Sequence, residues 1–250
     1  MRIGVIIQAR MGSNRLPGKV MKSFYKEYTL IEVLLNNLKK ISGIKIIVAT
    51  STNPENDVLE NFLISKGYIV YRGSENDVLE RFIGAAETNG IDGVIRICSD
   101  NPFLDKYGIS ELIEKAKNSN ADYIGFRVNG KPSILTHFGF WSEYATLSAL
   151  KKVAATTSPN TPAREHVTYH IYNNSDEYKC EWIECPEFVQ GRNDIRLTVD
   201  TPEDFDNARR IYSELNAWNE DFSLNDVVCY LDFHKDLKES MLDIINKNKK

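Results

Sequence analysis

The first half of the chain alternates short apolar runs with segments in which apolar residues recur every three or four positions. The run Ile3–Ile7 is continuously apolar, which is typical of a parallel strand buried on both faces. Between residues 29 and 41, leucine and isoleucine recur at helical spacing and predict an amphipathic helix. The same alternation predicts further strands at 44–49, 68–71, 93–98 and 121–126, and helices at 54–66, 75–87 and 109–117. It therefore predicts an α/β fold with a mostly parallel central sheet and helices on both faces.

The pattern changes after residue 126. Residues 127–161 carry Gly130, Pro132 and Pro159 around an apolar stretch at 138–141, and we interpret them as an insertion. This insertion either covers the site as a lid or pairs with a second copy in a homodimer. Beyond it the sequence predicts a helix at 162–172, strands at 180–183 and 195–199, helices after Asp200 and a frayed lysine-rich end at 247–250. No linker or repeat divides the chain, so residues 1–250 are predicted to form a single domain.

Charge is unevenly distributed along the 250 residues. The chain holds 31 basic and 35 acidic residues, a net charge of −4, which argues against sequence-independent nucleic-acid binding. Residues 1–26, however, carry six basic residues and no acidic one, whereas residues 27–250 carry 25 basic and 35 acidic ones. A positive segment on an acidic body indicates a small anionic ligand.

The cysteines do not define a disulfide framework or a zinc site. They are Cys98, Cys180, Cys185 and Cys229. No pair has CxxC spacing, so we expect reduced thiols. The first apolar run is interrupted by Gln8 and Arg10, unlike a secretory signal, and no run reaches the length of a membrane span. We therefore expect a cytoplasmic protein that spans no membrane.

A loop rich in cations and glycine follows the first predicted strand. Arg10, Arg15 and Lys19 bring three cations into it, and Gly12 and Gly18 allow backbone N–H groups to approach a ligand closely. The loop matches neither a P-loop nor a GxGxxG fingerprint. A solvated basic turn is the alternative. Because ligands bind at the carboxyl ends of parallel strands, this position favours an anion site.

Two aspartates, Asp100 and Asp200, each follow a predicted strand. Carboxylates at strand ends on one sheet edge can hold Mg²⁺ between them, while the cation keeps several waters and bridges substrate phosphates. Taken singly, each residue is more often a turn former or a helix cap than a metal ligand, above all Asp200 before Thr201-Pro202. The segment Asp204-Phe205-Asp206 matches the DxD of glycosyltransferases in form, but it falls inside a predicted helix and we discount it.

The loop QARMGSNRLPGK (8–19) resembles the signature of the sugar-activating cytidylyltransferases. Among these the SpsF-type spore-coat polysaccharide family is most similar, and the CMP-Kdo and CMP-sialate synthetases are related. The likeness extends in order to YRGSENDVLERF (71–82), VIRICSDNPFLD (94–105), REHVTYHIY (164–172) and RLTVDTPEDF (196–205). The resemblance implies a Rossmann-like, nucleotide-diphospho-sugar transferase-like fold. It also implies that a sugar hydroxyl attacks the α-phosphate of CTP and that pyrophosphate leaves.

The resemblance assigns roles to individual positions. It implies catalytic roles for Arg10, Lys19 and Asp100. It implies nucleotide contacts from Ala9, Arg10, Gly12, Ser13, Arg15, Lys19 and Arg72. It places Asp77, Arg96 and His166 on the sugar side, and Asp100 and Asp200 on Mg²⁺.

The acceptor is left open by two departures from the family pattern. His137 lies in THFGFW (136–141), which is closer to the CMP-Kdo synthetases than to the acidic stretch of the SpsF-type relatives, and Cys98 stands where relatives carry Thr or Gln. The sequence thus predicts a Mg²⁺-dependent enzyme that joins CTP to an acidic or modified sugar for a surface polysaccharide. The alternatives are a nucleotidyltransferase with another nucleotide or a non-sugar acceptor, and a non-catalytic nucleotide-binding subunit.

Overall fold

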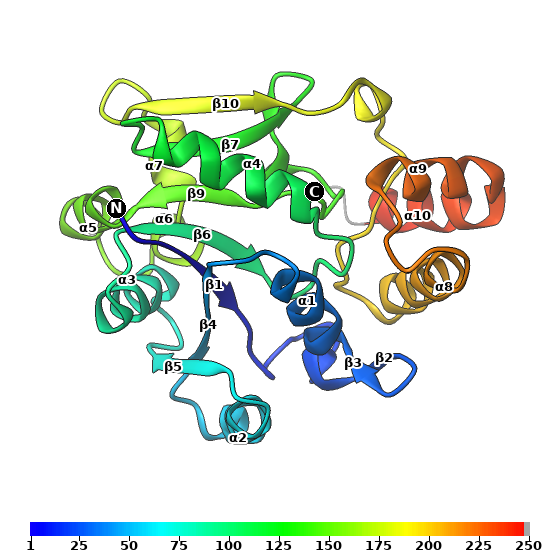
Figure 1. Cartoon of the computed structure of the whole chain (residues 1–250), viewed down its shortest axis with the longest axis horizontal. Coiled ribbons are helices and arrows are strands. Elements are labelled where there is room, and N and C mark those ends of the chain that lie inside the picture. Colours follow the sequence, from blue (N-terminus) through cyan, green and yellow to red (C-terminus); the bar gives the residue numbers. More distant parts are fainter. Residues whose placement is uncertain (248–250) are drawn as a thin grey trace.

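The computed structural model describes residues 1–247, and Figure 1 shows its strands fanning from β10 at the top to β5 at the bottom. The strands of the central sheet are β1 (Ile3–Gln8), β4 (Lys45–Ser51), β5 (Ile69–Gly73), β6 (Gly93–Cys98), β7 (Tyr123–Val128), β8 (Lys131–Pro132), β9 (Glu143–Thr146) and β10 (Cys180–Glu184). A small hairpin pairs β2 (Ser23–Tyr25) with β3 (Tyr28–Thr29).

Helices connect and cover these strands. They are α1 (Leu30–Lys39), α2 (Asp57–Ser65), α3 (Val78–Asn89), α4 (Lys106–Lys117), α5 (Leu147–Thr156), α6 (Pro162–Glu165), α7 (Tyr169–Asn173), α8 (Pro202–Trp218), α9 (Leu224–Phe233) and α10 (Lys235–Lys247). Short 3-10 turns are η1 (Lys19–Met21), η2 (Pro54–Asn56), η3 (Ser133–Leu135) and η4 (Glu187–Val189). No helix within residues 1–247 has both the length and the apolarity to cross a membrane.

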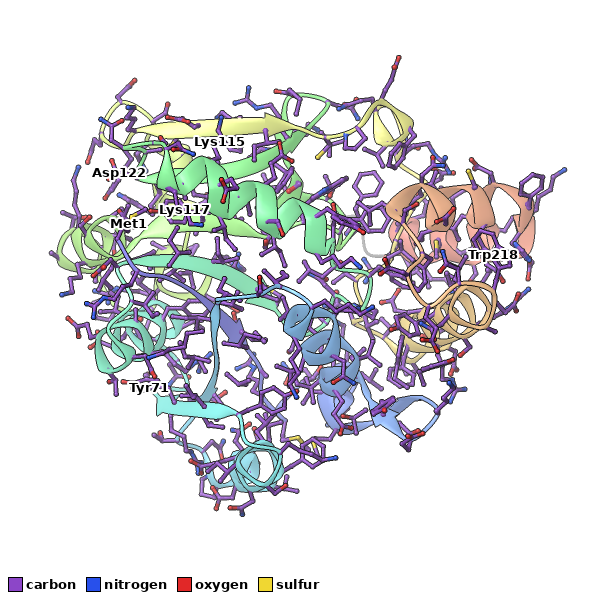
Figure 2. The ribbon with its side chains drawn as sticks, in the orientation of Figure 1. Met1, Tyr71, Lys115, Lys117, Asp122 and Trp218 are labelled. Carbon is purple, nitrogen blue, oxygen red and sulfur yellow. The ribbon has the colours of Figure 1, made fainter. Side chains whose placement is uncertain are left out.

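The strand order brings the ends of β1 and β6 together. It runs β10-β7-β9-β6-β1-β4-β5, and every pairing in this series is parallel except those of β9, which lies antiparallel between β6 and β7. Gln8, at the end of β1, is in register with Cys98, at the end of β6. The loops that leave these strands therefore begin side by side at one sheet edge. Met1 and Asp122, labelled in Figure 2, mark the opposite edge, where β1 and β7 begin.

Apolar residues of β1 alternate between two cores, as a strand buried on both faces requires. Val5 and Ile7 pack into the core formed with α1, α4 and the C-terminal helices. Ile6 packs into the second core, formed with α3, α5 and α7. The predicted sheet with helices on both faces is thus confirmed, and the segments predicted as strands up to residue 126 fall on observed strands.

Residues 127–161, interpreted as an insertion, contain β8, η3, β9 and α5, and their role as a lid or in a homodimer stays a prediction. Two local predictions were wrong. The predicted helix at 162–172 is interrupted between α6 and α7. Residues 195–199 form no strand, since the N–H of Leu197 bonds to the carbonyl of His137 and that of Val199 to the carbonyl of Asp100. Most of the tail predicted to fray, at 248–250, lies outside the described residues.

Candidate functional site

A polar cleft of about 270 Å³ opens where β1 and β6 end. The residues that line it are Gln8, Arg10, Ser13, Asn14, Arg15, Lys19, Cys98, Ser99, Asp100 and Asp200. The structure therefore brings together six of the residues predicted for the site, three of them cations from the first loop and two of them aspartates from distant segments.

A buried asparagine from the segment after β4 anchors the first loop through hydrogen bonds. Asn56, 0% exposed, accepts the Met11 N–H through its side-chain oxygen at 2.8 Å and donates to the Ser51 hydroxyl at 2.8 Å. Gly18 has a φ of 66°, and its N–H bonds to the carbonyl of Met11. That conformation suits glycine and turns the chain back, so that Lys19 enters the cleft at the start of η1.

Lys19 lies between the two aspartates. Its Nζ is 3.0 Å from Asp100 Oδ2 and 3.4 Å from Asp200 Oδ1, and it donates to the carbonyl of Val199 at 2.7 Å. Burial lowers the pKa of Lys19, but the charges of Asp100 and Asp200 more than offset this effect and leave the pKa raised. The ammonium group therefore keeps its charge and holds two carboxylates together that would otherwise repel each other.

Asp200 is fixed by the segment around it. The Val199 N–H bonds to the Asp100 carbonyl at 2.9 Å, which places the two aspartates side by side. Arg196, with a side chain only 2% exposed, donates to Asp200 Oδ2 at 3.2 Å and binds Asp204 through two N–H groups at 2.7 and 2.9 Å. Arg15 adds a contact to Asp200 at 3.1 Å from the solvent side.

The aspartate pair fits a divalent cation that also binds phosphate. Asp100 Oδ1 is buried and has no hydrogen-bond partner among residues 1–247. Two carboxylates match what Mg²⁺ commonly takes from a protein, because waters and substrate phosphates supply its other oxygens. Within the same described residues no third His, Cys, Asp or Glu joins the pair to make an all-protein cage. The donor set therefore suits a cation that arrives with a nucleotide.

A second hollow of about 360 Å³ continues from the cleft. Cys98, Asp100 and Asp200 line both. The other residues of this adjacent pocket are Arg96, Asn101, Ser133, Ile134, Leu135, Thr136, His137, Gly139, Phe140, Trp141, His166 and Thr198. Burial raises the pKa of Cys98 to about 11, so its thiol is neutral at the border between the two hollows.

Arg96 lines the adjacent pocket, and a buried carboxylate fixes its guanidinium. Its Nη1 donates to Glu143 at 2.6 Å, and Glu143 also accepts from the hydroxyls of Tyr123 and Thr168 at 2.7 and 3.0 Å. Nε of Arg96 is buried without a partner among residues 1–247. The network fixes the arginine and leaves one buried N–H donor without a partner among the described residues.

His137 and Asn101 add polar groups to the same pocket. Arg196 Nη1 is 2.9 Å from His137 Nδ1, and arginine can only donate, so Nε2 carries the histidine proton. Burial and the Arg196 charge lower the pKa of His137, which favours this neutral form. Asn101 is 7% exposed, and its Oδ1 has no partner within residues 1–247. The pocket thus offers a donor and an acceptor to a hydroxylated ligand.

Four predicted site residues do not line either hollow. Ala9 is 1% exposed, and Gly12 lies against the Glu55 side chain. Arg72 forms ion pairs with Asp57 and Glu60 and bonds to the carbonyls of Ser51 and Asn53. Asp77 caps α3 and accepts a hydrogen bond from Arg164 at 2.9 Å. The roles given to these residues stay predictions.

Several residues of the site were not among those predicted. In the sequence, His137 and Cys98 stand out only as departures from the family pattern. Asn101 and Arg196 lie inside the matching segments 94–105 and 196–205, but nothing in the sequence assigns them a role. Glu143 had no signal at all, because its partners come from β6, β7 and the α6–α7 junction.

Comparison with known proteins agrees with this geometry. A family model described as cytidylyltransferase matches residues 4–241. An uncharacterised protein of Methanocaldococcus jannaschii is 35% identical over 249 residues, 99% of this chain and 98% of the relative. The spore coat polysaccharide biosynthesis protein SpsF of Bacillus subtilis is 30% identical over 236 residues, 92% of this chain and 94% of the relative.

A solved structure shares the fold over nearly the whole chain. It is a cytidylyltransferase from Leptospira borgpetersenii, 28% identical, with a TM-score of 0.80 and coverage of 95% of this chain and 96% of that one. The fold is that of the nucleotide-diphospho-sugar transferases, as the resemblance to the cytidylyltransferases implies. The cationic loop, the paired aspartates and the family match lead to one conclusion: the chain belongs to the cytidylyltransferase family.

Proposed function

We propose that this protein is a Mg²⁺-dependent cytidylyltransferase that transfers CMP from CTP to a hydroxyl of an acidic or modified sugar and releases pyrophosphate. One observation supports this most strongly. The cationic cleft and the adjacent pocket meet at Asp100 and Asp200. A triphosphate in the cleft would then bring its α-phosphorus to the border with the acceptor. We further propose that the protein works in the cytoplasm, in surface polysaccharide biosynthesis.

The residues of the cleft have distinct tasks in this reaction. Arg10 and Arg15 bind phosphate oxygens, because a guanidinium matches their geometry. Lys19 donates to the oxygens that gain charge as pyrophosphate leaves. Asp100 and Asp200 would hold Mg²⁺, which supplies charge neutralisation at the phosphates when bound.

The adjacent pocket orients the acceptor. In our proposal Arg96, which lines this pocket and whose Nε has no partner within residues 1–247, donates to a carboxylate or another oxygen of the sugar. His137 donates through Nε2, and Asn101 Oδ1 accepts from a hydroxyl. In our proposal these contacts, together with the apolar rings of Phe140 and Trp141, set the orientation of the attacking hydroxyl.

Nucleotide-dependent thermal protection tests the proposal. We expect CTP with Mg²⁺ to raise the melting temperature more than UTP, ATP or GTP, because a ligand that binds only the folded state stabilises it. Pyrophosphate release with CTP and a panel of 3-deoxy-ulosonates and nonulosonates then identifies the acceptor. Protection by none of the four nucleotides would refute the proposal. Binding of CTP without pyrophosphate release on any acceptor would instead support a non-catalytic subunit.

Removing the Arg10 guanidinium is expected to weaken nucleotide binding. In Arg10→Ala the dissociation constant of CTP should rise about 10- to 100-fold, the cost of one charge-assisted contact to phosphate. Isothermal titration calorimetry measures it. Arg2→Ala is the matched control, because Arg2 pairs with Asp92 at the opposite sheet edge and should leave the constant unchanged. Equal affinities of Arg10→Ala and the control would remove Arg10 from the phosphate site.

A further inference from the structure

Arg81, in the first turns of α3, carries a guanidinium that is wholly buried and largely without partners. The residue is 0% exposed. Its Nη1 donates to the carbonyl of Ser74 at 2.7 Å, whereas Nε and Nη2 have no hydrogen-bond partner among residues 1–247. Burial lowers the pKa of Arg81. Leaving an arginine charge uncompensated in the interior is costly, so these two donors call for an explanation.

Among the carboxylates, Glu75 has the largest effect on the pKa of Arg81, and it is already bound to Arg10. Glu75 Oε1 accepts from Arg10 Nη1 at 2.7 Å, and Oε2 is buried without a hydrogen-bond partner in the described part of the chain. Burial raises the pKa of Glu75. The hydrogen bonds from Ser51 and Arg10 and the charges of Arg10 and Arg81 have a larger effect in the opposite direction, so the pKa lies below its ordinary value. Glu75 thus pairs with Arg10, which lines the cleft, and directly follows Ser74, whose carbonyl Arg81 binds.

The position of Arg81 is fixed by close packing between β5 and α3. The Tyr71 side chain, whose place in the fold is labelled in Figure 2, lies so close to Gly84 that a Cβ there would come within 2.0 Å of its hydroxyl. A Cβ on Gly73 would lie 3.1 Å from Arg81 Cγ. The arginine is therefore held against the loop that carries Glu75, and the side chain with room to move is the partly exposed Arg10.

We propose that Arg81 is a positioning residue that takes over Glu75 when Arg10 turns to the triphosphate. This inference rests on the proposed nucleotide site. When Arg10 turns Nη1 from Glu75 to the phosphate oxygens, Glu75 loses its ion pair with Arg10. The free Nε–Nη2 edge of Arg81 is a planar fork that matches a carboxylate. The exchange keeps Glu75 paired in both states and satisfies the donors of Arg81 only when nucleotide is bound.

Double-mutant calorimetry separates this exchange from a structural role. We expect Arg81→Met to weaken CTP binding in the presence of Mg²⁺ about tenfold, because Glu75 then has no second partner and retains Arg10. Adding Glu75→Gln to Arg81→Met should restore the affinity to within about twofold of the wild type, since a neutral amide holds Arg10 weakly. Glu75→Gln alone is the matched single variant that closes the cycle.

The outcomes are distinct. A purely structural role lowers the melting temperature of Arg81→Met but gives the single and double variants the same CTP affinity, which overturns the exchange. So does wild-type affinity in Arg81→Met. If the wild-type protein binds none of the four nucleotides, the proposed function itself fails.

A spectroscopic measurement on the wild-type chain covers the case in which Arg81→Met does not fold. In protein labelled with ¹⁵N-arginine, the Nε–H signal of Arg81, assigned with Arg81→Lys, should shift and exchange more slowly with water once CTP and Mg²⁺ are added. An unchanged signal at saturating CTP would overturn the exchange. The matched signal of Arg196, already bonded to Asp204 in the free protein, should change less.

Discussion

Replacing Asp100 by asparagine is expected to lower kcat about 10²- to 10³-fold while leaving the protein folded. Asparagine keeps the size of the side chain but removes the charge that Lys19 pairs with at 3.0 Å and that a divalent cation requires. The gain in CTP affinity on adding Mg²⁺ should disappear as well. Calorimetry with and without Mg²⁺ measures that gain without an acceptor, and pyrophosphate release measures kcat with the acceptor that the panel identifies.

The matched control for Asp100→Asn lies at the other end of the same strand. Asp92 directly precedes β6, whereas Asp100 follows it, and Asp92 pairs with Arg2 at an exposed position. Asp92→Asn should keep both kcat and the Mg²⁺-dependent gain in affinity. If Asp100→Asn retains that gain, Asp100 does not hold the cation.

The first loop and Asp100 could be predicted from the sequence because their positions follow from local pattern and strand register. A continuous apolar run identifies β1, a second one identifies β6, and parallel pairing places their carboxyl ends together. Lys19 and Asp100 meet for this reason. This prediction requires only the positions at which the strands end, and no knowledge of contacts between side chains.

Asp200 lies beside Asp100 in the cleft, as predicted, but no strand places it there. The apolar and polar residues at 195–199 predicted a strand, yet no strand forms there. The N–H of Val199 bonds instead to the carbonyl of Asp100, outside any sheet. Hydrogen bonds to the carbonyls of Asp100 and His137, far away in sequence, decide this conformation, and the pattern within five residues carries no information about them.

Partners that lie far away in sequence also decide the structure around β9 and the contacts of Arg72. β9 is short and lies between β6 and β7, where Glu143 binds Arg96, Tyr123 and Thr168 from three separate segments. Arg72 lies near the carboxyl end of β5, but Asp57 and Glu60 bind its guanidinium. In both cases the deciding partner is a charge far away in sequence or on another element, which periodicity does not reveal.

Asp204→Ala is expected to cause the largest loss of stability. Asp204 accepts two hydrogen bonds from Arg196 and one each from the N–H groups of Asp200 and Thr201. Both side chains of the Arg196–Asp204 pair are 2% exposed. Removing one partner of such a buried pair costs about 3–5 kcal/mol, because the remaining charge stays buried. Urea denaturation should show this decrease in the free energy of unfolding.

Asp206, two residues further along α8, provides the control that makes the Asp204 result specific. Its side chain is 68% exposed and pairs with Arg209 on the helix surface, so Asp206→Ala should change the free energy of unfolding by no more than about 0.5 kcal/mol. The comparison also distinguishes two readings of Asp204-Phe205-Asp206. If the segment were a DxD metal site, both substitutions would remove the Mg²⁺-dependent gain in CTP affinity. If Asp204 acts by fixing Arg196 and Asp200, only Asp204→Ala removes it, and the loss accompanies the loss of stability.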